Sequence, residues 1–371
     1  MNNNADTVWL EINLGAIRRN VQRLGRISGK PVMAVVKANA YGHGLLEVSR
    51  AVLKGGAVRL CVARYEEALA LRLAGIDAPI LVLGLTSPEH ATNAARLNIS
   101  LTVFRKDIAL DYAKAMASEK NPLRLHVKVD TGMGRLGVFP DEAFDFVNQV
   151  RVEKNIFVEG LFTHFACADE LQTVTTELQL AKFNRVIHDL EAIGFRPNII
   201  HAANSAATLK YPQAGYDAVR PGIAVYGLDP SGDVPLPADF EPALTWKTRI
   251  TSIKTLPPNS GIGYNHHYIT HGYEKIGALG VGYADGLRRR LGNIALVHGT
   301  RVRQVGGMCM DQCTFQLDAV PEAKPGDEVV LLGKQGDERI SAEEIGLSWD
   351  TINYEVVCGL AARVPRYYFD D

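Results

Sequence analysis

The sequence predicts an α/β fold: a (β/α)8 barrel of the TIM type followed by a mainly β C-terminal domain. Three observations lead to this prediction. Short apolar strands alternate with amphipathic helical stretches through the first two thirds of the chain, as in parallel sheets with crossover helices. A proline-rich stretch then interrupts the alternation. Beyond it, short strand patterns are separated by Gly, Pro and Asp turns, which indicates a β domain.

The barrel strands are expected where short apolar runs end in a polar loop. Eight such runs occupy residues 31–37, 59–63, 79–83, 99–103, 123–129, 158–165, 199–202 and 218–226. Eight strand–helix units favour a closed barrel over the alternative, an open doubly wound sheet. Their span also fits the ~250 residues that are usual for this barrel.

Helices are expected between these strands. The stretch RYEEALALRLAG repeats apolar residues at spacings of three and four, and Gly75 stands where a helix-ending glycine is common. Three further helical stretches are KDIALDYAKAMASEK, PDEAFDFVNQV and TTELQLAKFNRVIHDLEAIG.

The composition changes after the eighth run. Residues 228–242, LDPSGDVPLPADFEP, are rich in proline and lack periodicity, which is typical of a linker. We therefore expect a barrel domain over residues 14–235 and a mainly β domain over residues 236–371. In the second domain SAEEIGLSW is the one clear helix, with Ser341 and Glu344 as a capping box.

Composition and charge argue against several classes of protein. The net charge is −1 and there is no basic block, so neither nucleic acid nor an anionic membrane is the expected partner. We see no secretion signal in MNNNADTVWLEINL and no membrane span. The five scattered cysteines suggest a reducing, cytoplasmic location rather than a disulfide framework. No metal site is expected, because Cys309 and Cys313 have no second pair nearby and the histidines are scattered.

Polar residues follow the predicted strand ends, where barrels of this type place their active sites. Each alone has a structural explanation, since a histidine can be a satisfied core residue and an arginine a surface charge. Together they are expected to line one cavity, because all of these strand ends lie at the same end of the barrel. They are Lys37, Lys128, Asp130, Arg135, His164, Asp169, His201, Asn204, Ser205, Arg220 and Gly222.

Lys37 ends the apolar run in VMAVVKANAYGHG. Such a lysine either extends its charged end into water or is kept for chemistry. Lysine near other cations becomes a nucleophile toward carbonyls, and Ser205 and the PGI turn stand where these barrels often bind phosphate. This combination predicts a Schiff base with an aldehyde phosphate, with pyridoxal phosphate as the obvious candidate. A substrate-derived Schiff base, as in an aldolase, stays open.

A series of motifs resembles the bacterial alanine racemases. AVVKANAYGHG is similar to the pyridoxal-phosphate attachment motif of that family. The other motifs follow in the family's order along nearly the whole chain: VDTGMGRLG, THFACADE, HAANSAA, VRPGIAVYG, VGYADG, CMDQ and RVPR. The resemblance implies a pyridoxal 5′-phosphate enzyme that interconverts L- and D-alanine and supplies D-alanine for bacterial cell-wall peptidoglycan. It also implies that an N-terminal strand, residues 7–13, joins the β domain.

The resemblance further implies roles for individual residues. Lys37 would carry the cofactor as a Schiff base and would act with Tyr264 as one of two acid/base groups. Arg220 would lie at the pyridine nitrogen with His201 behind it, and His164 would lie near the ring. The phosphate would be held by Tyr41, Ser205, Tyr354 and the backbone at Gly222 and Ile223.

The same resemblance implies how substrate and subunits are arranged. Arg135 would approach the cofactor's phenolic oxygen, positioned by Lys128, which is often carbamylated in this family. Tyr283, Met310 and Asp311 would line the mouth of the site and bind the substrate carboxylate. A head-to-tail homodimer would bring the Tyr264 of each chain to the Lys37 of the other.

Two features depart from the family pattern. Asn265, His266 and His267 follow Tyr264, where smaller or different residues are more usual, and Gly307 stands where an arginine is common. Because both lie near the expected mouth, a racemase of broader or serine specificity stays an alternative. A related barrel-type decarboxylase is a second alternative, although it would place a carboxylate where this chain has Arg220. A non-catalytic cofactor-binding barrel would lack the second domain.

Overall fold

The computed structural model describes residues 6–171 and 173–371 of the chain. These residues form two compact units. The first unit comprises Ala16–Ala40 and Leu45–Glu241, and the second comprises the residues up to Gly15 together with Tyr41–Gly44 and Pro242–Asp371.

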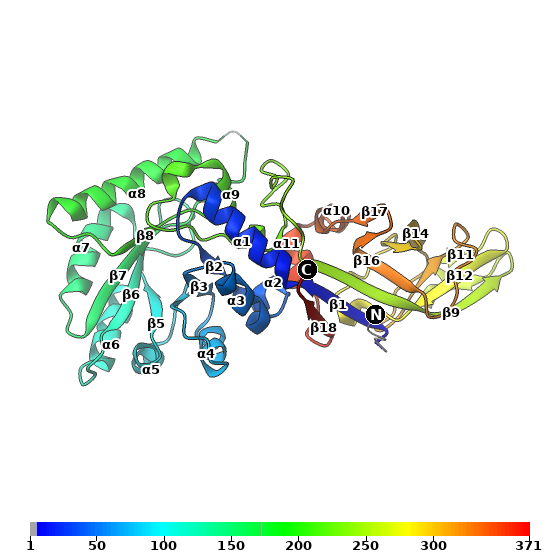
Figure 1. Ribbon diagram of the computed structural model, residues 1–371, viewed down its shortest axis with the longest axis horizontal. Helices are drawn as coiled ribbons and strands as arrows, with labels where there is room; N and C mark the ends of the chain where they lie inside the picture. The colour runs from blue at the N-terminus through cyan, green and yellow to red at the C-terminus, as the bar shows by residue number, and fades with distance from the viewer. Residues whose placement is uncertain (1–5, 172) are drawn as a thin grey trace. The chain divides into compact units, whose positions relative to one another are not determined.

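The first unit is built on a parallel sheet of seven strands whose order follows the sequence. The helices lie outside these strands (Figure 1). The strands are β2 (Met33–Val35), β3 (Arg59–Val62), β4 (Ile80–Val82), β5 (Ile99–Val103), β6 (Leu123–Lys128), β7 (Ile156–Phe162) and β8 (Ile199–His201). The sequence therefore predicts the parallel arrangement correctly, and each of these seven strands overlaps the range predicted for it.

The eighth predicted strand, 218–226, is much shorter than expected. Isolated parallel bridges join Val32 to Val219 and His201 to Ala218, so this segment lies between β2 and β8 and closes the ring. After it the chain turns into the 3-10 helix η3 (Ile223–Tyr226). The reason is Pro221, which has no N–H for a further ladder bond and offers only its carbonyl to Val35 N at 3.0 Å.

The predicted helices are confirmed by α4 (Tyr65–Leu73), α6 (Lys106–Ala115), α7 (Pro140–Arg151) and α8 (Thr175–Ala192). Helix α7 begins with a proline in its first turn, where the missing N–H is no loss. It buries Ala143, Phe146, Val147 and Val150, which form one face. The remaining barrel helices are α1 (Leu14–Ser28), α3 (Leu45–Lys54), α5 (Ala91–Arg96) and α9 (Ser205–Lys210), and the short segment α2 (Lys37–Tyr41) has left-handed dihedral angles at its inner residues.

The inside of the barrel is polar, although the strands have an apolar sequence. In β5, Ile99, Leu101 and Val103 alternate with Ser100 and Thr102, and all five are buried. Polar side chains from β3, β5, β6, β7 and β8 meet one another by hydrogen bonds, so they must point into the ring. The apolar side chains that alternate with them along each strand then face the helices.

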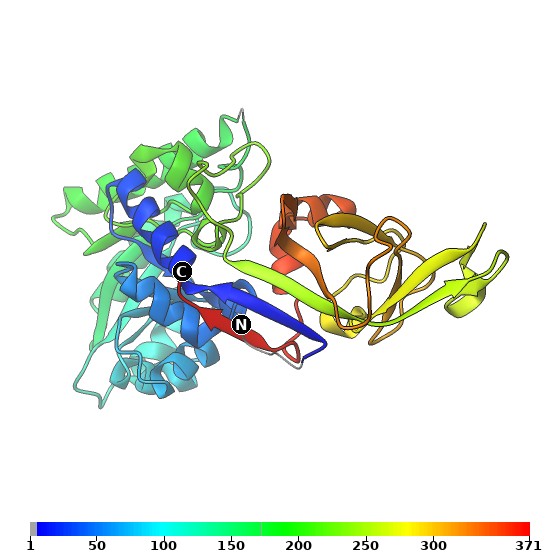
Figure 2. The same ribbon diagram turned by 45° about the vertical axis from the view of Figure 1, so that its right-hand side comes forward.

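The second unit is built on a nine-stranded sheet. Strand β1 (Val8–Asn13) pairs antiparallel with β9 (Leu244–Leu256) and parallel with β18 (Arg366–Phe369), as the turned view in Figure 2 lets the reader follow. The sheet order is β17-β16-β13-β14-β15-β12-β9-β1-β18. The other strands are β12 (Glu274–Leu279), β13 (Ile294–Val297), β14 (Thr300–Gln304), β15 (Cys313–Gln316), β16 (Glu328–Gln335) and β17 (Glu338–Ile340).

Two α-helices lie entirely within the described residues of this unit. The predicted helix is α10 (Ala342–Ser348), and the Ser341 hydroxyl caps it by accepting from Glu344 N at 3.1 Å. The expectation of a single clear helix is wrong, because α11 (Asn353–Cys358) follows it. Six residues are too few to show a helical period in the sequence, and α11 is held by tertiary packing of Val356 and Val357, which are buried.

Candidate active site

Lys37 lies two residues after the end of β2 and begins the segment α2 (Lys37–Tyr41). Residues Ala38, Asn39 and Ala40 have φ of 54°, 55° and 53°, which is a left-handed turn without glycine. This conformation is unfavourable for L-residues, and such strain persists where the surroundings enforce it. Here Ala38 N donates to Glu67 Oε1 at 2.6 Å and Leu45 N donates to Asn39 Oδ1 at 2.8 Å.

A group of cations surrounds Lys37 at this end of the barrel. Burial lowers the pKa of Lys128 to about 8, and the charges of Arg135, Arg220 and Lys37 act in the same direction. The pKa of His164 is lowered well below its ordinary value by burial and then by the same set, Arg220, Lys128, Arg135 and Lys37. The structure therefore brings together five of the residues that the sequence places at strand ends, with a surplus of positive charge.

The loop after β6 holds Arg135 through one carboxylate. The two carboxylate oxygens of Asp130 accept hydrogen bonds from the backbone N–H groups of the next turn at 2.9 to 3.1 Å: Gly132, Met133, Gly134 and Arg135. Partial burial acts to raise the pKa of Asp130, but these N–H groups lower it overall. Gly132 and Gly134 have φ of 141° and 68°, which explains the two glycines of DTGMG.

Arg220 is fully enclosed beside the barrel interior. Its Nη1 contacts His201 Nδ1 at 2.6 Å, and its Nη2 donates to Thr163 O at 2.8 Å and Ala202 O at 3.2 Å. The Phe162 ring stacks on His201 with centroids 4.8 Å apart and carries the Arg220 guanidinium at 5.1 Å. Burial lowers the pKa of Arg220 to about 10, which keeps it a cation at neutral pH.

Ser205 and Gly222 are joined by a direct hydrogen bond. The Ser205 hydroxyl oxygen accepts from Gly222 N at 2.9 Å and from Ala224 N at 3.3 Å. Asn204 caps α9 by accepting from Ala207 N at 2.9 Å, which fixes the start of the segment that carries Ser205. Hydroxyl and backbone N–H groups beside a cationic cluster fit an anionic phosphate-bearing group.

Tyr41 belongs to the second unit, where it lies near Tyr354. The two ring centroids are 6.2 Å apart. The loop Tyr41–Gly44 approaches the C-terminal segment so closely that a Cβ on Gly42 would lie 2.0 Å from Val357 O. The structure thus pairs the two tyrosines that the family resemblance assigns to the phosphate.

The loops that carry Tyr283 and Met310 are bound together in the second unit. Arg363 donates from Nε to Asp285 Oδ1 at 2.8 Å and from Nη2 to Asp311 Oδ1 at 2.7 Å. The backbone N–H of Ala284 also donates to Met310 O at 3.0 Å. Three of the residues expected at the mouth of the site therefore lie together.

Tyr264 begins the 3-10 helix η4 (Tyr264–His266) in the second unit, and its side chain is 68% exposed. Asn265 has φ of 58°, and a Cβ on Gly261 would lie 2.2 Å from the His266 ring. Three of the departures from the family pattern, Asn265, His266 and His267, thus lie in one local turn at Tyr264, and Gly307 lies close to this turn, because a Cβ on Gly307 would lie 3.5 Å from Tyr264 O. Tyr264 and Lys37 belong to different units.

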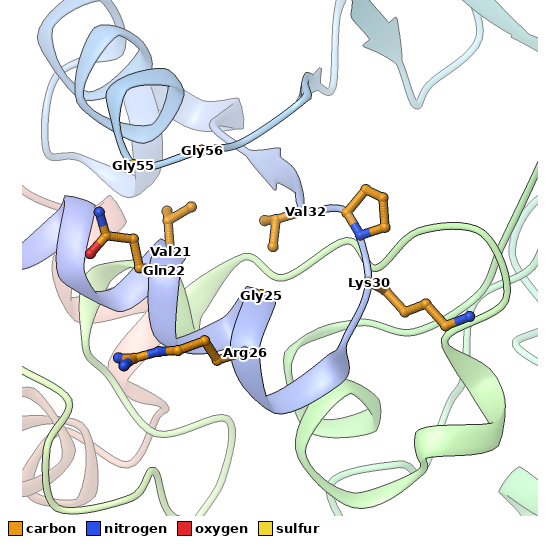
Figure 3. A pocket seen from close by; sticks show the side chains of 9 residues that line it. Val21, Gln22, Gly25, Arg26, Lys30, Val32, Gly55 and Gly56 are labelled. Carbon is orange, nitrogen blue, oxygen red and sulfur yellow. The ribbon is translucent and has the colours of Figure 1, made fainter.

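A pocket of about 470 Å³ lies at the opposite end of the barrel strands (Figure 3). It is lined at the start of β2 by Pro31 and Val32, whereas Lys37 follows the other end of that strand. Arg26 and Lys30 also line it, and their side chains point away from each other. This pocket is separate from the cationic cluster.

Three buried residues of the barrel interior were not predicted as site residues: Arg59, His126 and Glu159. They connect by hydrogen bonds to His201 and so to Arg220. The sequence does carry a signal for them, which is the alternation of polar and apolar residues along a strand. Arg124, His126 and Lys128 alternate in RLHVK, so one face of that strand is polar throughout.

None of the described helices is both long and apolar enough to cross a membrane.

Comparisons with known proteins agree with this geometry. The sequence pattern of the alanine racemase N-terminal domain matches residues 12–230, and that of the C-terminal domain matches residues 243–368. The alanine racemase of Methanococcus maripaludis is 45% identical over 97% of this chain and 98% of its own. That of Geobacillus stearothermophilus is 44% identical over 100% of this chain and 95% of its own.

Solved structures give the same result. The crystal structure of alanine racemase from Bacillus anthracis with bound L-Ala-P superimposes with a TM-score of 0.94 at 40% identity, covering 99% of this chain and 96% of that one. The chain therefore belongs to the alanine racemase family, and it racemises alanine with pyridoxal 5′-phosphate as cofactor.

Proposed function

We propose that this enzyme moves the α-proton of alanine with two groups, Lys37 on one face of the substrate and Tyr264 on the other. Pyridoxal 5′-phosphate, when bound, withdraws electrons from the α-carbon and so makes its hydrogen acidic. Two bases on opposite faces exchange that hydrogen without turning the substrate over. The observation that carries the proposal is the cationic cluster around Lys37, which fits the anionic cofactor. The product D-alanine serves bacterial cell-wall peptidoglycan.

The residues near the cluster suit a division of roles. Ser205, Gly222 and Ile223 would hold the phosphate together with Tyr41 and Tyr354, supported by the Ser205–Gly222 contact and by the tyrosine pair. Arg220 would contact the pyridine nitrogen, and His164 would lie beside the ring. An arginine is a poor proton donor because its pKa is high, so it would leave that nitrogen unprotonated and restrain side reactions.

Substrate binding would combine both units of the fold. Arg135, whose backbone N–H is held by Asp130, would bind the substrate from the barrel unit. Met310, Asp311 and Tyr283 would line the mouth, supported by their connection through Arg363. The barrel unit would correspond to a cofactor-binding domain over residues 14–235, and residues 236–371 with strand 7–13 would form the second domain.

Lys128 is proposed to be carbamylated. Its lowered pKa provides a neutral amine near pH 8, which adds to carbon dioxide and releases a proton to give a carbamate. The new negative charge would lie among Arg135, Arg220 and Lys37 and would offset part of their repulsion. A 13C resonance from labelled bicarbonate should be present in the wild type and absent from Lys128→Arg; its presence in that variant would contradict the assignment.

We propose a homodimer with shared active sites, in which Tyr264 serves the Lys37 of the partner chain. The exposed Tyr264 side chain supports this arrangement, because a group so open to water cannot control a proton unless another surface covers it. The enzyme would work in the cytoplasm, where this family typically acts.

The test of the Lys37 assignment is borohydride reduction followed by peptide mapping. The cofactor should be trapped on the peptide that contains Lys37, and Lys37→Ala should lose both the trapped cofactor and racemisation. Trapping on a peptide with Lys128 instead would refute the assignment. Racemisation and carbon dioxide release, measured over a panel of L-amino acids, would separate alanine specificity from serine specificity and from decarboxylation.

A further inference from the structure

A chain of buried side chains crosses the barrel interior behind Arg220. From Arg220 it runs to His201 Nδ1 at 2.6 Å, from His201 Nε2 to His126 Nδ1 at 2.8 Å, and from His126 Nε2 to Glu159 Oε2 at 2.9 Å. Arg59 ends the chain with two bonds to the Glu159 carboxylate, at 2.8 and 3.0 Å. All five residues are buried, with exposures from 0% to 5%.

We propose that Glu159 and His126, anchored by Arg59, are positioning residues that orient Arg220 by setting the tautomer of His201. The inference rests on the proposed role of Arg220 toward the cofactor and assigns a purpose to three residues deep in the barrel. Neither Glu159 nor His126 touches the reacting atoms.

The direction of every hydrogen bond in this chain follows from its two ends. A guanidinium has only donors, so His201 must present an unprotonated Nδ1 to Arg220 and carry its hydrogen on Nε2. That hydrogen points to His126 Nδ1, which must therefore accept. His126 then carries its own hydrogen on Nε2 and donates it to the Glu159 carboxylate.

The opposite arrangement fails at Arg220. If Arg59 Nη1, which lies 3.2 Å from His126 Nε2, donated to that nitrogen, His126 would carry its hydrogen on Nδ1. His201 would then be protonated on Nδ1, 2.6 Å from a guanidinium N–H. Two donors would face each other in a buried site, where an unsatisfied donor costs ~1–3 kcal/mol.

Both imidazoles are neutral, as the chain requires. Burial lowers the pKa of His126 to about 4, although the hydrogen bond that His126 donates to Glu159 acts against it. Burial and the charge of Arg220 lower the pKa of His201 well below its ordinary value. A neutral imidazole has a single N–H group. Each ring can therefore donate from only one of its nitrogens and must accept at the other, so only one of the two arrangements is present at a time.

The backbone makes room for this chain. The register between β6 and β7 shifts after Leu125, so Leu125 pairs with Val158 but His126 pairs with Gly160. This bulge leaves Glu159 as an extra residue on β7. A Cβ on Gly160 would lie 2.2 Å from His126 Nδ1, so only glycine leaves space for the imidazole. The bulge and the glycine both serve the same contact.

A simple structural role is the competing explanation, because buried charges must be paired wherever they occur. Arg59, Ser100 and Arg124 would satisfy Glu159 without His126, since Ser100 Oγ donates at 2.7 Å and Arg124 at 3.2 Å. The contact to His126 is therefore not needed to neutralise Glu159. It is needed to fix which nitrogen of His126 carries the hydrogen.

The test uses the holoenzyme labelled with 15N-histidine, in which protonated and unprotonated ring nitrogens give separate resonances. His126 and His201 should both be protonated at Nε2. A hydrogen on Nδ1 of either ring in the wild type would overturn the proposal before any variant is made.

Two variants of His126 separate orientation from packing. His126→Leu removes the acceptor for His201 Nε2, so His201 should become a mixture of tautomers. We expect kcat to fall about 10- to 100-fold, by analogy with the loss of hydrogen-bond partners that orient metal-binding histidines, with KM for alanine little changed. His126→Asn places an amide oxygen near the position of Nδ1, so the His201 tautomer and most of the lost kcat should return.

Thr102→Val is the matched control. Thr102 is a buried barrel residue, and its hydroxyl donates to Val82 O, which is not part of the hydrogen-bonded series from Arg220 to Arg59. This substitution should lower the stability of the fold without changing the tautomer of His126 or His201. Equal losses of kcat in His126→Leu, His126→Asn and Thr102→Val, with an unchanged His201 tautomer, would overturn the proposal. A changed tautomer without loss of kcat would also refute it, and would place the failure in the assumed role of Arg220.

Discussion

The pKa values of individual cations near Lys37 are set first by burial, and for Lys128 the charges of Arg135 and Arg220 outweigh the opposing charge of Asp130. Lys128 and Arg220 both have lowered pKa values, and burial is the largest cause for each. Asp130 is nearby, but its carboxylate is occupied by backbone N–H groups. The cluster therefore keeps its positive charge for an anionic ligand, which is the electrostatic requirement of a phosphate-bearing cofactor.

Protonation of His126 is predicted to destabilise the fold in mild acid. Burial lowers the folded-state pKa of His126 from 6.5 to about 4, whereas an unfolded chain takes up the proton near pH 6.5. The unfolded state then binds more protons, so this contribution to stability is present above pH 6.5 and is lost as the pH falls toward 4. The free energy of unfolding, measured with denaturant at fixed protein and cofactor concentrations, should fall in that window.

The variant His126→Asn cannot titrate there, so its curve should be shallower than that of the wild type between pH 6.5 and 4. His188→Asn is the matched control, because His188 is exposed on α8 and its replacement should leave the slope unchanged. Parallel curves for the wild type and His126→Asn would contradict the prediction.

At the scale of elements, the alternation of strands and helices was predictable because each strand buries one apolar face. Strands β5 and β6 match the predicted ranges or lie within them, and the four helices recognised by their periodicity do so to within one residue. Strand β7 was placed two residues late, because the exposed Phe157 and the charged Glu159 obscure its start.

Other features left no local signal in the sequence. The left-handed turn at Ala38 and Ala40 uses alanines, for which this conformation is rare, so only the surrounding contacts explain it. The grouping of Tyr41 with Tyr354 depends on packing between segments more than 300 residues apart. Chemistry at strand ends was recognisable, whereas the chain through His126 required knowing which strand face points inward.

The loop after β6 is predicted to depend on the charge of Asp130. In Asp130→Asn, the amide NH2 group faces at least one backbone N–H that now donates to the carboxylate, most directly Arg135 N at 3.0 Å. Losing such a bond costs ~1–3 kcal/mol, enough to loosen Arg135. We expect kcat/KM for alanine to fall about tenfold or more, as measured by a coupled D-alanine assay.

Asp145→Asn is the control for charge alone, since Asp145 is exposed on α7 and is not part of the loop. Its kcat/KM should match that of the wild type. If both variants retain full activity, Asp130 does not position Arg135.

At the scale of the whole molecule, the proposed mechanism places its two acid/base groups in different units of the fold. Lys37 belongs to the barrel unit, and Tyr264 lies on an exposed turn of the second unit. A two-fold dimer in which each second unit serves the partner's barrel makes two sites from one type of contact. Each site would then contain Lys37 from one chain and Tyr264 from the other.

Subunit exchange tests this arrangement directly. Lys37→Ala and Tyr264→Phe should each be inactive alone. In a mixed dimer, one site receives both substitutions and the other receives neither, so random pairing should restore about a quarter of wild-type activity. Lys37→Ala mixed with Arg220→Leu is the matched control: both changes lie in the barrel unit, so every site keeps a damaged barrel and no activity should return. A mixture of Lys37→Ala and Tyr264→Phe that demonstrably exchanges subunits yet stays inactive would show that both groups come from one chain.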